Sequence, residues 1–167
     1  AQAKNDGRNG YHFFTSRLNE QIAEFVSMES NLAEALNRNE FILHFQPYFD
    51  CVSRRITGME ALIRWMRSDG QLVSPGSFIP VLEDTGLIVP VGEWTISETC
   101  RQINAWRGAG LPVVPISVNL SPVQFSRSDL LDRIQSIVSD LEVDASHLVF
   151  EITESTFMKD VDYTHSL

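Results

Sequence analysis

The stretch GMEALIRW, residues 58–65, places a glutamate and an arginine inside an otherwise apolar run. Successive side chains of a strand point to opposite faces, so a strand here puts Glu60, Leu62 and Arg64 on one face. The other face is wholly apolar. Burying an unpaired charge costs on the order of several kcal/mol. The fold must therefore supply something that compensates Glu60 and Arg64.

Composition narrows the class of protein. The chain has 167 residues with 43% hydrophobic content, enough for one ordinary globular domain. No apolar run approaches the ~20 residues that span a bilayer. The formal net charge of −9 disfavours binding to polymeric nucleic acid or to an anionic membrane surface, so we expect neither contact. An anionic ligand would need an arginine or a metal ion.

The N-terminal sequence and the cysteines indicate the setting in which the protein is found. The chain begins AQAKNDGRNG, which is polar, lacks a signal peptide and has no starting methionine, so we expect a segment of a larger protein. Cys51 and Cys100 lack metal-ligand spacing. A reduced, cytoplasmic setting is the simpler interpretation, with membrane anchoring possible only through upstream domains.

Apolar periodicity predicts alternating strands and helices. Strands are expected at 41–46, where Pro47 ends the run, around 60–65, at 113–121 and at 147–155; helices are expected at 22–36, 75–86, 93–107 and 130–141. This order is typical of a parallel α/β architecture. No GxGxxG follows a strand, which leaves a (β/α) barrel. Such barrels need ~250 residues, so about half of one is present.

Three predicted strands each deliver an oxygen ligand near the end of an apolar run: Glu60, Asn119 and Glu151. Two carboxylates and an amide suit Mg²⁺, Mn²⁺ or Ca²⁺ rather than Zn²⁺. Each residue alone could instead be a buried polar group hydrogen-bonded to a loop. Because all three meet at one rim of the sheet, we favour a shared metal site.

Other polar residues extend this candidate site. Arg64 suits a phosphate, because its guanidinium presents a fork of donors; an ion pair with Glu60 or Glu151 is the alternative. Gln46 either faces the same mouth or caps the sheet end. His44 shares its face, but a single histidine in a strand is typically a core residue.

Five segments together resemble the EAL-domain family of cyclic di-GMP phosphodiesterases: FQPYFD at 45–50, EALIRW at 60–65, the run at 72–94, VNLSPVQF at 118–125 and FEITES at 150–155. The resemblance assigns 37–167 to the N-terminal half of an EAL domain. Residues 1–16, with AKNDGRNGYHFF, resemble the final strand region of a GGDEF diguanylate cyclase domain, and 17–36 would be a connecting helix.

The resemblance implies a TIM-like barrel of the EAL type, whose first strand is antiparallel to the rest. It also implies hydrolysis of cyclic di-GMP to linear pGpG by two-metal catalysis with Mg²⁺ or Mn²⁺. Glu60, Asn119 and Glu151 would be the catalytic metal ligands. Gln46, Leu62 and Arg64 would bind substrate, and Glu154 would stabilise a loop.

The sequence also departs from the family pattern. It stops at Leu167, before the family's paired aspartates, its lysine and its later Glu and Gln. We therefore expect no appreciable phosphodiesterase activity from this chain alone, and self-association into a homo-oligomer through open sheet edges. A catalytically inactive cyclic di-GMP receptor is the alternative function, and a purely structural module is a further one.

Overall fold

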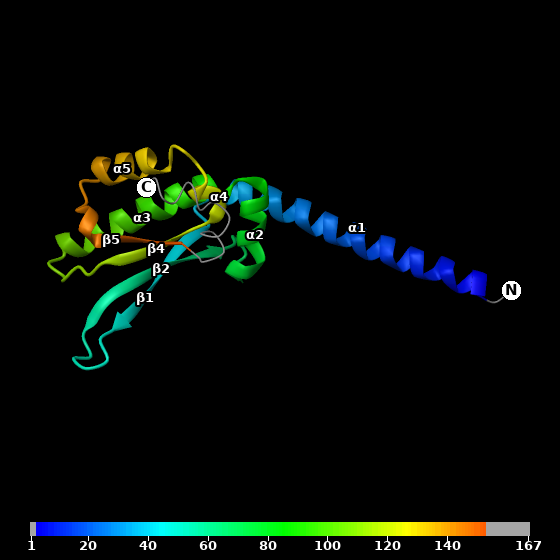
Figure 1. The fold of residues 1–167 in the computed structure, drawn as a ribbon, viewed down its shortest axis with the longest axis horizontal. Coiled ribbons are helices and arrows are strands. Elements are labelled where there is room, and N and C mark those ends of the chain that lie inside the picture. Colours follow the sequence, from blue (N-terminus) through cyan, green and yellow to red (C-terminus); the bar gives the residue numbers. More distant parts are fainter. Residues whose placement is uncertain (1–2, 153–167) are drawn as a thin grey trace.

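A computed structural model describes residues 3–152, with the side chains of 18–20 and 22–152. The helices are α1 (Ala3–Ala35), α2 (Pro75–Thr85), α3 (Ile88–Gly108), α4 (Pro122–Phe125), α5 (Leu130–Asp140) and the short 3₁₀ helix η1 (Ala145–His147). The strands are β1 (Phe41–Phe49), β2 (Ile56–Met66), β3 (Leu72–Val73), β4 (Ile116–Leu120) and β5 (Leu148–Ile152). α1 projects away from the rest of the molecule (Figure 1).

The strands form one mixed sheet with the order β1-β2-β4-β5, in which β3 also pairs with β2. β1 is antiparallel to β2, whereas β4 is parallel to both β2 and β5. This arrangement confirms the antiparallel first strand. On β2, only Met59 to Ala61 pair with β4. The second half of β2, residues 62–66, continues without pairing to β4.

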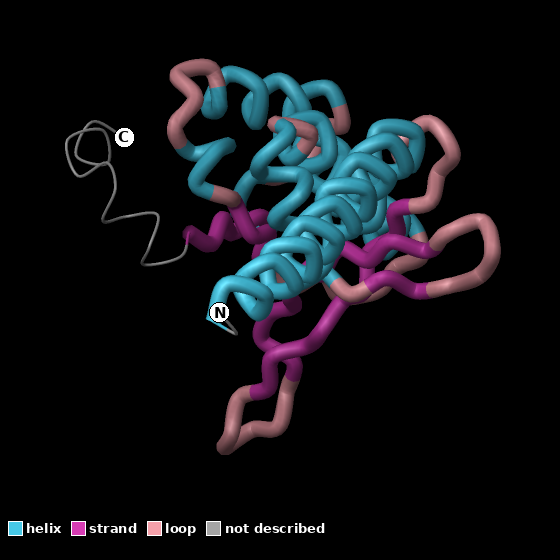
Figure 2. The backbone as a smooth tube through the Cα atoms, turned by 90° about the vertical axis from the view of Figure 1, so that its right-hand side faces the viewer, coloured by secondary structure: helices cyan, strands magenta, loops and turns pink. Residues whose placement is uncertain are grey.

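The hydrophobic core lies between the sheet and the helices. α3 and α5 lie on the same side of the sheet (Figure 1), and the tube view shows helices gathered on one side and strands on the other (Figure 2). Alternate residues of the strands face this core, among them Ala61 on β2, Val118 on β4 and Phe150 on β5. The intervening residues form what we call the polar face: Tyr48, Glu60, Arg64, Ser117, Asn119 and Glu151.

A second core cluster joins α1 and α2 to the sheet. Phe41, Trp65 and Phe78 pack with tilted or edge-on rings whose centroids are 6.0–6.5 Å apart. Leu32 of α1 is buried in the same cluster. The Trp65 indole donates a hydrogen bond to the buried Glu40 carboxylate over 2.9 Å, which satisfies both polar groups inside the core.

Among the predicted boundaries that differ from the structure, two lie at prolines. β1 continues through Pro47 to Phe49. Among residues 3–152 it pairs with β2 alone, and an edge strand tolerates a residue that has no N–H. α3 begins at Ile88 rather than at residue 93 and contains Pro90. Proline is compatible with the first turn of a helix, where no backbone partner is lost.

The N-terminal segment also differs from expectation. Residues 3–14 resembled the end of a sheet, but they belong to the continuous helix α1. A strand needs a neighbouring strand for its backbone hydrogen bonds, and within residues 3–152 no strand pairs with this segment. A helix satisfies those groups internally. The predicted division of the chain at residues 16 and 36 stays a prediction.

Candidate functional site

The predicted metal ligands meet on the polar face. The Asn119 side-chain amide donates a 2.7 Å hydrogen bond to the Glu60 carboxylate, although 59 residues separate them in the chain. Asn119 and Glu151 are direct partners in the parallel pairing of β4 and β5. Because the side chains of paired residues point to the same face, Glu60, Asn119 and Glu151 form one group.

Two further residues join this group that the sequence did not indicate. The Tyr48 hydroxyl lies 3.3 Å from the second Glu60 carboxylate oxygen, to which it donates, and 3.2 Å from the Ser117 hydroxyl. The hydrogen bond to Ser117 lowers the Tyr48 pKa, but desolvation and the negative charges of Glu60 and Glu151 outweigh it and raise that pKa. The negative charges of Glu60 and Glu151 therefore both disfavour ionisation of the Tyr48 hydroxyl.

No basic side chain within the described part of the chain forms an ion pair with this acidic group. Among the ion pairs of the described residues, none involves Glu60 or Glu151. Arg64 instead donates to its neighbouring Ile63 carbonyl over 2.8 Å, so the ion-pair alternative for Arg64 is not seen there. Two carboxylates and an amide without a counter-ion are a donor set that fits a hard divalent cation.

The described residues nevertheless provide few ligands for a metal ion. Within residues 3–152, no group of three or more His, Cys, Asp or Glu side chains is placed to hold a metal ion. Glu60 and Glu151 supply two carboxylates, and the third oxygen comes from Asn119. The described residues therefore offer part of one coordination sphere.

Of the other predicted site residues, some lie on strands next to this group and one lies outside residues 3–152. Gln46 is exposed and pairs with Glu60 across the β1–β2 ladder, and Leu62 pairs with His44. The prediction that His44 is a core residue was wrong: it is exposed, on the side of β1 that also carries Gln46 and Tyr48. Glu154 lies outside the described residues, so its predicted role stays a prediction.

A pocket of about 330 Å³ adjoins the carboxylate group. It lies where β2 continues past the end of its pairing with β4. Leu62 and Arg64 of β2 line it together with Asn119. Its other walls come from α2, α3 and the start of α4, including Pro75, Ile79, Glu83, Ile88 and Gln124.

The turn after β4 is held by side-chain hydrogen bonds. Ser121 begins α4 with a capping box, in which its hydroxyl accepts from the Gln124 backbone N–H and its own N–H donates to the Gln124 side chain. Serine followed by proline, as in Ser121-Pro122, is a typical start of a helix. A Cβ atom at Gly92 of α3 would lie 1.9 Å from Gln124 Nε2, so any larger residue there would require the Gln124 side chain to move. The box thus fixes the turn that follows Asn119.

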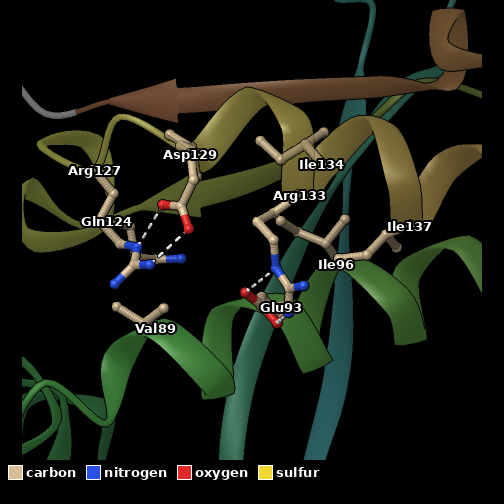
Figure 3. A pocket seen from close by; sticks show the side chains of 10 residues that line it. Val89, Glu93, Ile96, Gln124, Arg127, Asp129, Arg133, Ile134 and Ile137 are labelled. Carbon is tan, nitrogen blue, oxygen red and sulfur yellow. Dashed lines mark hydrogen bonds and ion pairs between the residues drawn. The ribbon is translucent and has the colours of Figure 1, made fainter.

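A second, smaller pocket lies between α3 and α5. Figure 3 shows two arginine–carboxylate pairs around it, Arg127 with Asp129 and Arg133 with Glu93. The latter joins α5 to α3 through two hydrogen bonds of 2.9 and 2.7 Å. The pocket holds about 20 Å³, roughly the space of one water molecule. We assign it a packing role.

With this geometry established, the chain can be compared with known proteins. The EAL domain family matches residues 29–166. The bifunctional diguanylate cyclase/cyclic di-GMP phosphodiesterase MucR of Pseudomonas aeruginosa is 41% identical over 160 residues, covering 96% of this chain and 23% of MucR. The cyclic di-GMP phosphodiesterase PdeR of Escherichia coli is 30% identical over 157 residues, covering 94% of this chain and 23% of PdeR.

Solved structures agree in fold. The phosphodiesterase PaMucR in its c-di-GMP complex superposes with a TM-score of 0.77 at 40% identity, covering 81% of this chain and 55% of that one. The EAL enzyme Bd1971, bound to cAMP and cyclic di-GMP, gives 0.77 at 25% identity, covering 87% and 42%. The chain belongs to the EAL-domain family. It spans about a quarter of the length of the curated relatives named above.

No helix among residues 3–152 is long and apolar enough to cross a membrane.

Proposed function

We propose that this chain forms part of a cyclic di-GMP phosphodiesterase, in which the polar face of the sheet binds a divalent cation beside a substrate pocket. The observation that carries the proposal is the hydrogen bond between Asn119 and Glu60, formed next to Glu151 and without a basic counter-ion among the described residues. Cyclic di-GMP is supported by the similarity to PaMucR, whose structure contains that ligand.

In this proposal Glu60, Asn119 and Glu151 bind Mg²⁺ or Mn²⁺. When bound there, such cations would activate water for attack and offset the negative charge of a phosphate. Glu60 accepts hydrogen bonds from both Asn119 and Tyr48, which hold its carboxylate at a defined orientation. Such second contacts orient a metal ligand before the ion arrives.

Substrate contacts come from the pocket wall. Arg64 lines the pocket and has further N–H donors besides the one bonded to Ile63, so it can bind a phosphate oxygen. Leu62 supplies an apolar surface for a base, and Gln46 contacts the substrate from β1. Arg64 and the cations together overcome the repulsion between an acidic chain and a doubly anionic ligand.

The same proposal extends to architecture and setting. The antiparallel β1 and the parallel β2, β4 and β5 are the first strands of a (β/α) barrel, whose interior is the polar face. We propose a homo-oligomer in the cytoplasm.

A receptor without turnover is the second candidate function, because the described residues supply only part of one coordination sphere. Two-metal hydrolysis requires more ligands than Glu60, Asn119 and Glu151 provide. On that ground, little turnover by this chain alone stays our prediction.

The test is to titrate the chain with cyclic di-GMP in Mg²⁺ and then in Ca²⁺, and to measure binding and the formation of pGpG. Binding that weakens in Glu60→Gln and Asn119→Ala, but not in Glu24→Gln on the exposed surface of α1, supports the site. Formation of pGpG that Ca²⁺ abolishes indicates the enzyme, and binding without product indicates the receptor. Absence of binding by the wild-type chain would contradict the proposal.

A further inference from the structure

The polar groups that line the 330 Å³ pocket are nearly all engaged within the protein. The Thr95 hydroxyl donates to the Val91 carbonyl over 2.9 Å, as helical threonines do. The Asn119 amide donates to Glu60. Ser121 and Gln124 satisfy each other in the capping box of α4. Each of these four side chains therefore already makes a hydrogen bond within the protein.

Glu83 is the exception. It is partly buried on α2, it lines the pocket, and its side-chain carboxylate makes no hydrogen bond or ion pair with another of the described residues. The neighbouring lining residues Pro75, Ile79 and Ile88 are apolar. A carboxylate on an apolar wall can accept two hydrogen bonds at once, so the pocket is suited to a flat ligand that presents two adjacent donors.

We propose that Glu83 determines base specificity by accepting hydrogen bonds from the N1–H and N2 amino group of a guanine. This inference rests on the proposed function, which supplies a guanine dinucleotide as the ligand. Leu62 and Ile79 bound the base, and Arg64 in the same pocket takes the phosphate, so one nucleotide is held at both ends. Enzymes commonly read an extruded base through its Watson–Crick edge in this way.

The chemistry separates guanine from adenine. Adenine presents an acceptor at N1 beside the donor N6 amino group, so a carboxylate opposite it gains one hydrogen bond and meets one lone pair. A site that hydrogen-bonds its ligand rejects an analogue that leaves a buried polar group unpaired. Hypoxanthine retains N1–H and lacks the N2 amino group, so it should bind with intermediate affinity.

Glu83→Gln tests the inference because glutamine carries one acceptor and one donor, the pattern that complements adenine. Asp84→Asn is the matched control: the neighbouring residue is exposed, does not line the pocket and loses the same charge. Affinities for cyclic di-GMP, cyclic di-AMP and cyclic di-inosine monophosphate are measured by calorimetry at one Mg²⁺ concentration, with circular dichroism to verify folding.

We expect Glu83→Gln to bind cyclic di-GMP roughly tenfold more weakly, to bind cyclic di-AMP more tightly, and to lose most of the preference between the two. Asp84→Asn should keep the wild-type preference. If the wild-type chain binds cyclic di-GMP and Glu83→Gln keeps the same base preference, the role of Glu83 is overturned while the proposed function stands. If the wild-type chain binds none of the three dinucleotides, both are overturned.

Discussion

Replacing Gly92 by alanine probes how the turn after β4 is held. Gly92 lies inside α3, where a Cβ atom would come within 1.9 Å of Gln124 Nε2 and 2.7 Å of its Cδ. The end of a flexible side chain usually moves aside at little cost. Gln124 cannot, because it is only 4% exposed and its carbonyl oxygen accepts the Ser121 N–H. The alanine must therefore break the capping box or strain the contact between α3 and α4.

The size of the effect follows from three contributions. Loss of a cap costs about 1 kcal/mol, and overpacking of a buried contact costs about 1–3 kcal/mol. Alanine is a better helix former than glycine by about 1 kcal/mol, which offsets part of this. We expect Gly92→Ala to lower the free energy of unfolding by about 2 kcal/mol.

Urea denaturation followed by circular dichroism measures this change. Gly108→Ala is the control, since a Cβ atom there meets nothing within 4 Å and the variant should lose no stability. Adding Gln124→Ala to Gly92→Ala removes the clash, so the double variant should lose less than the sum of the two single losses. A Gly92→Ala chain as stable as the wild type, or strictly additive losses, would refute the reasoning.

Two further predictions concern the core. Trp65→Phe removes the donor that satisfies the buried Glu40 carboxylate and should cost about 1–3 kcal/mol in urea denaturation; a loss under about 0.3 kcal/mol would show that the bond contributes nothing net. Burial raises the pKa of the Cys100 thiol to about 11, whereas Cys51 is exposed. An aromatic disulfide reagent at pH 8 should therefore label one thiol in the folded chain and two in denaturant, and rapid labelling of both in the folded chain would contradict this.

The sequence predicted best where local pattern decides structure. Alternation in GMEALIRW put Glu60 and Arg64 on one face, and the structure agrees. The helix expected at 75–86 matches α2, because its start and end depend on neighbouring residues, namely Ser74-Pro75 and Gly86. The expected order of strands and helices from residue 41 onward is present.

Contacts between distant residues could not be read in this way. Tyr48 reaches Ser117 across 69 residues of sequence, and no local pattern marks a tyrosine as a partner of a future strand. The position of Glu83 in a pocket wall likewise depends on residues of β2 and α3 that are distant in the sequence. β3, with two residues, is too short to produce a periodic signal.

The residues of the candidate site lie far apart in the sequence, so the ribosome adds them to the chain at different times. β1 and β2 form a hairpin whose ladder needs no later residue, so it can fold soon after it leaves the ribosome. Asn119 and then Glu151 are synthesised afterwards, at about 5–20 residues per second. For several seconds the nascent chain therefore carries Glu60 without its neighbours. Cation binding by the nascent chain would then begin only once β5, the strand that carries Glu151, has been synthesised.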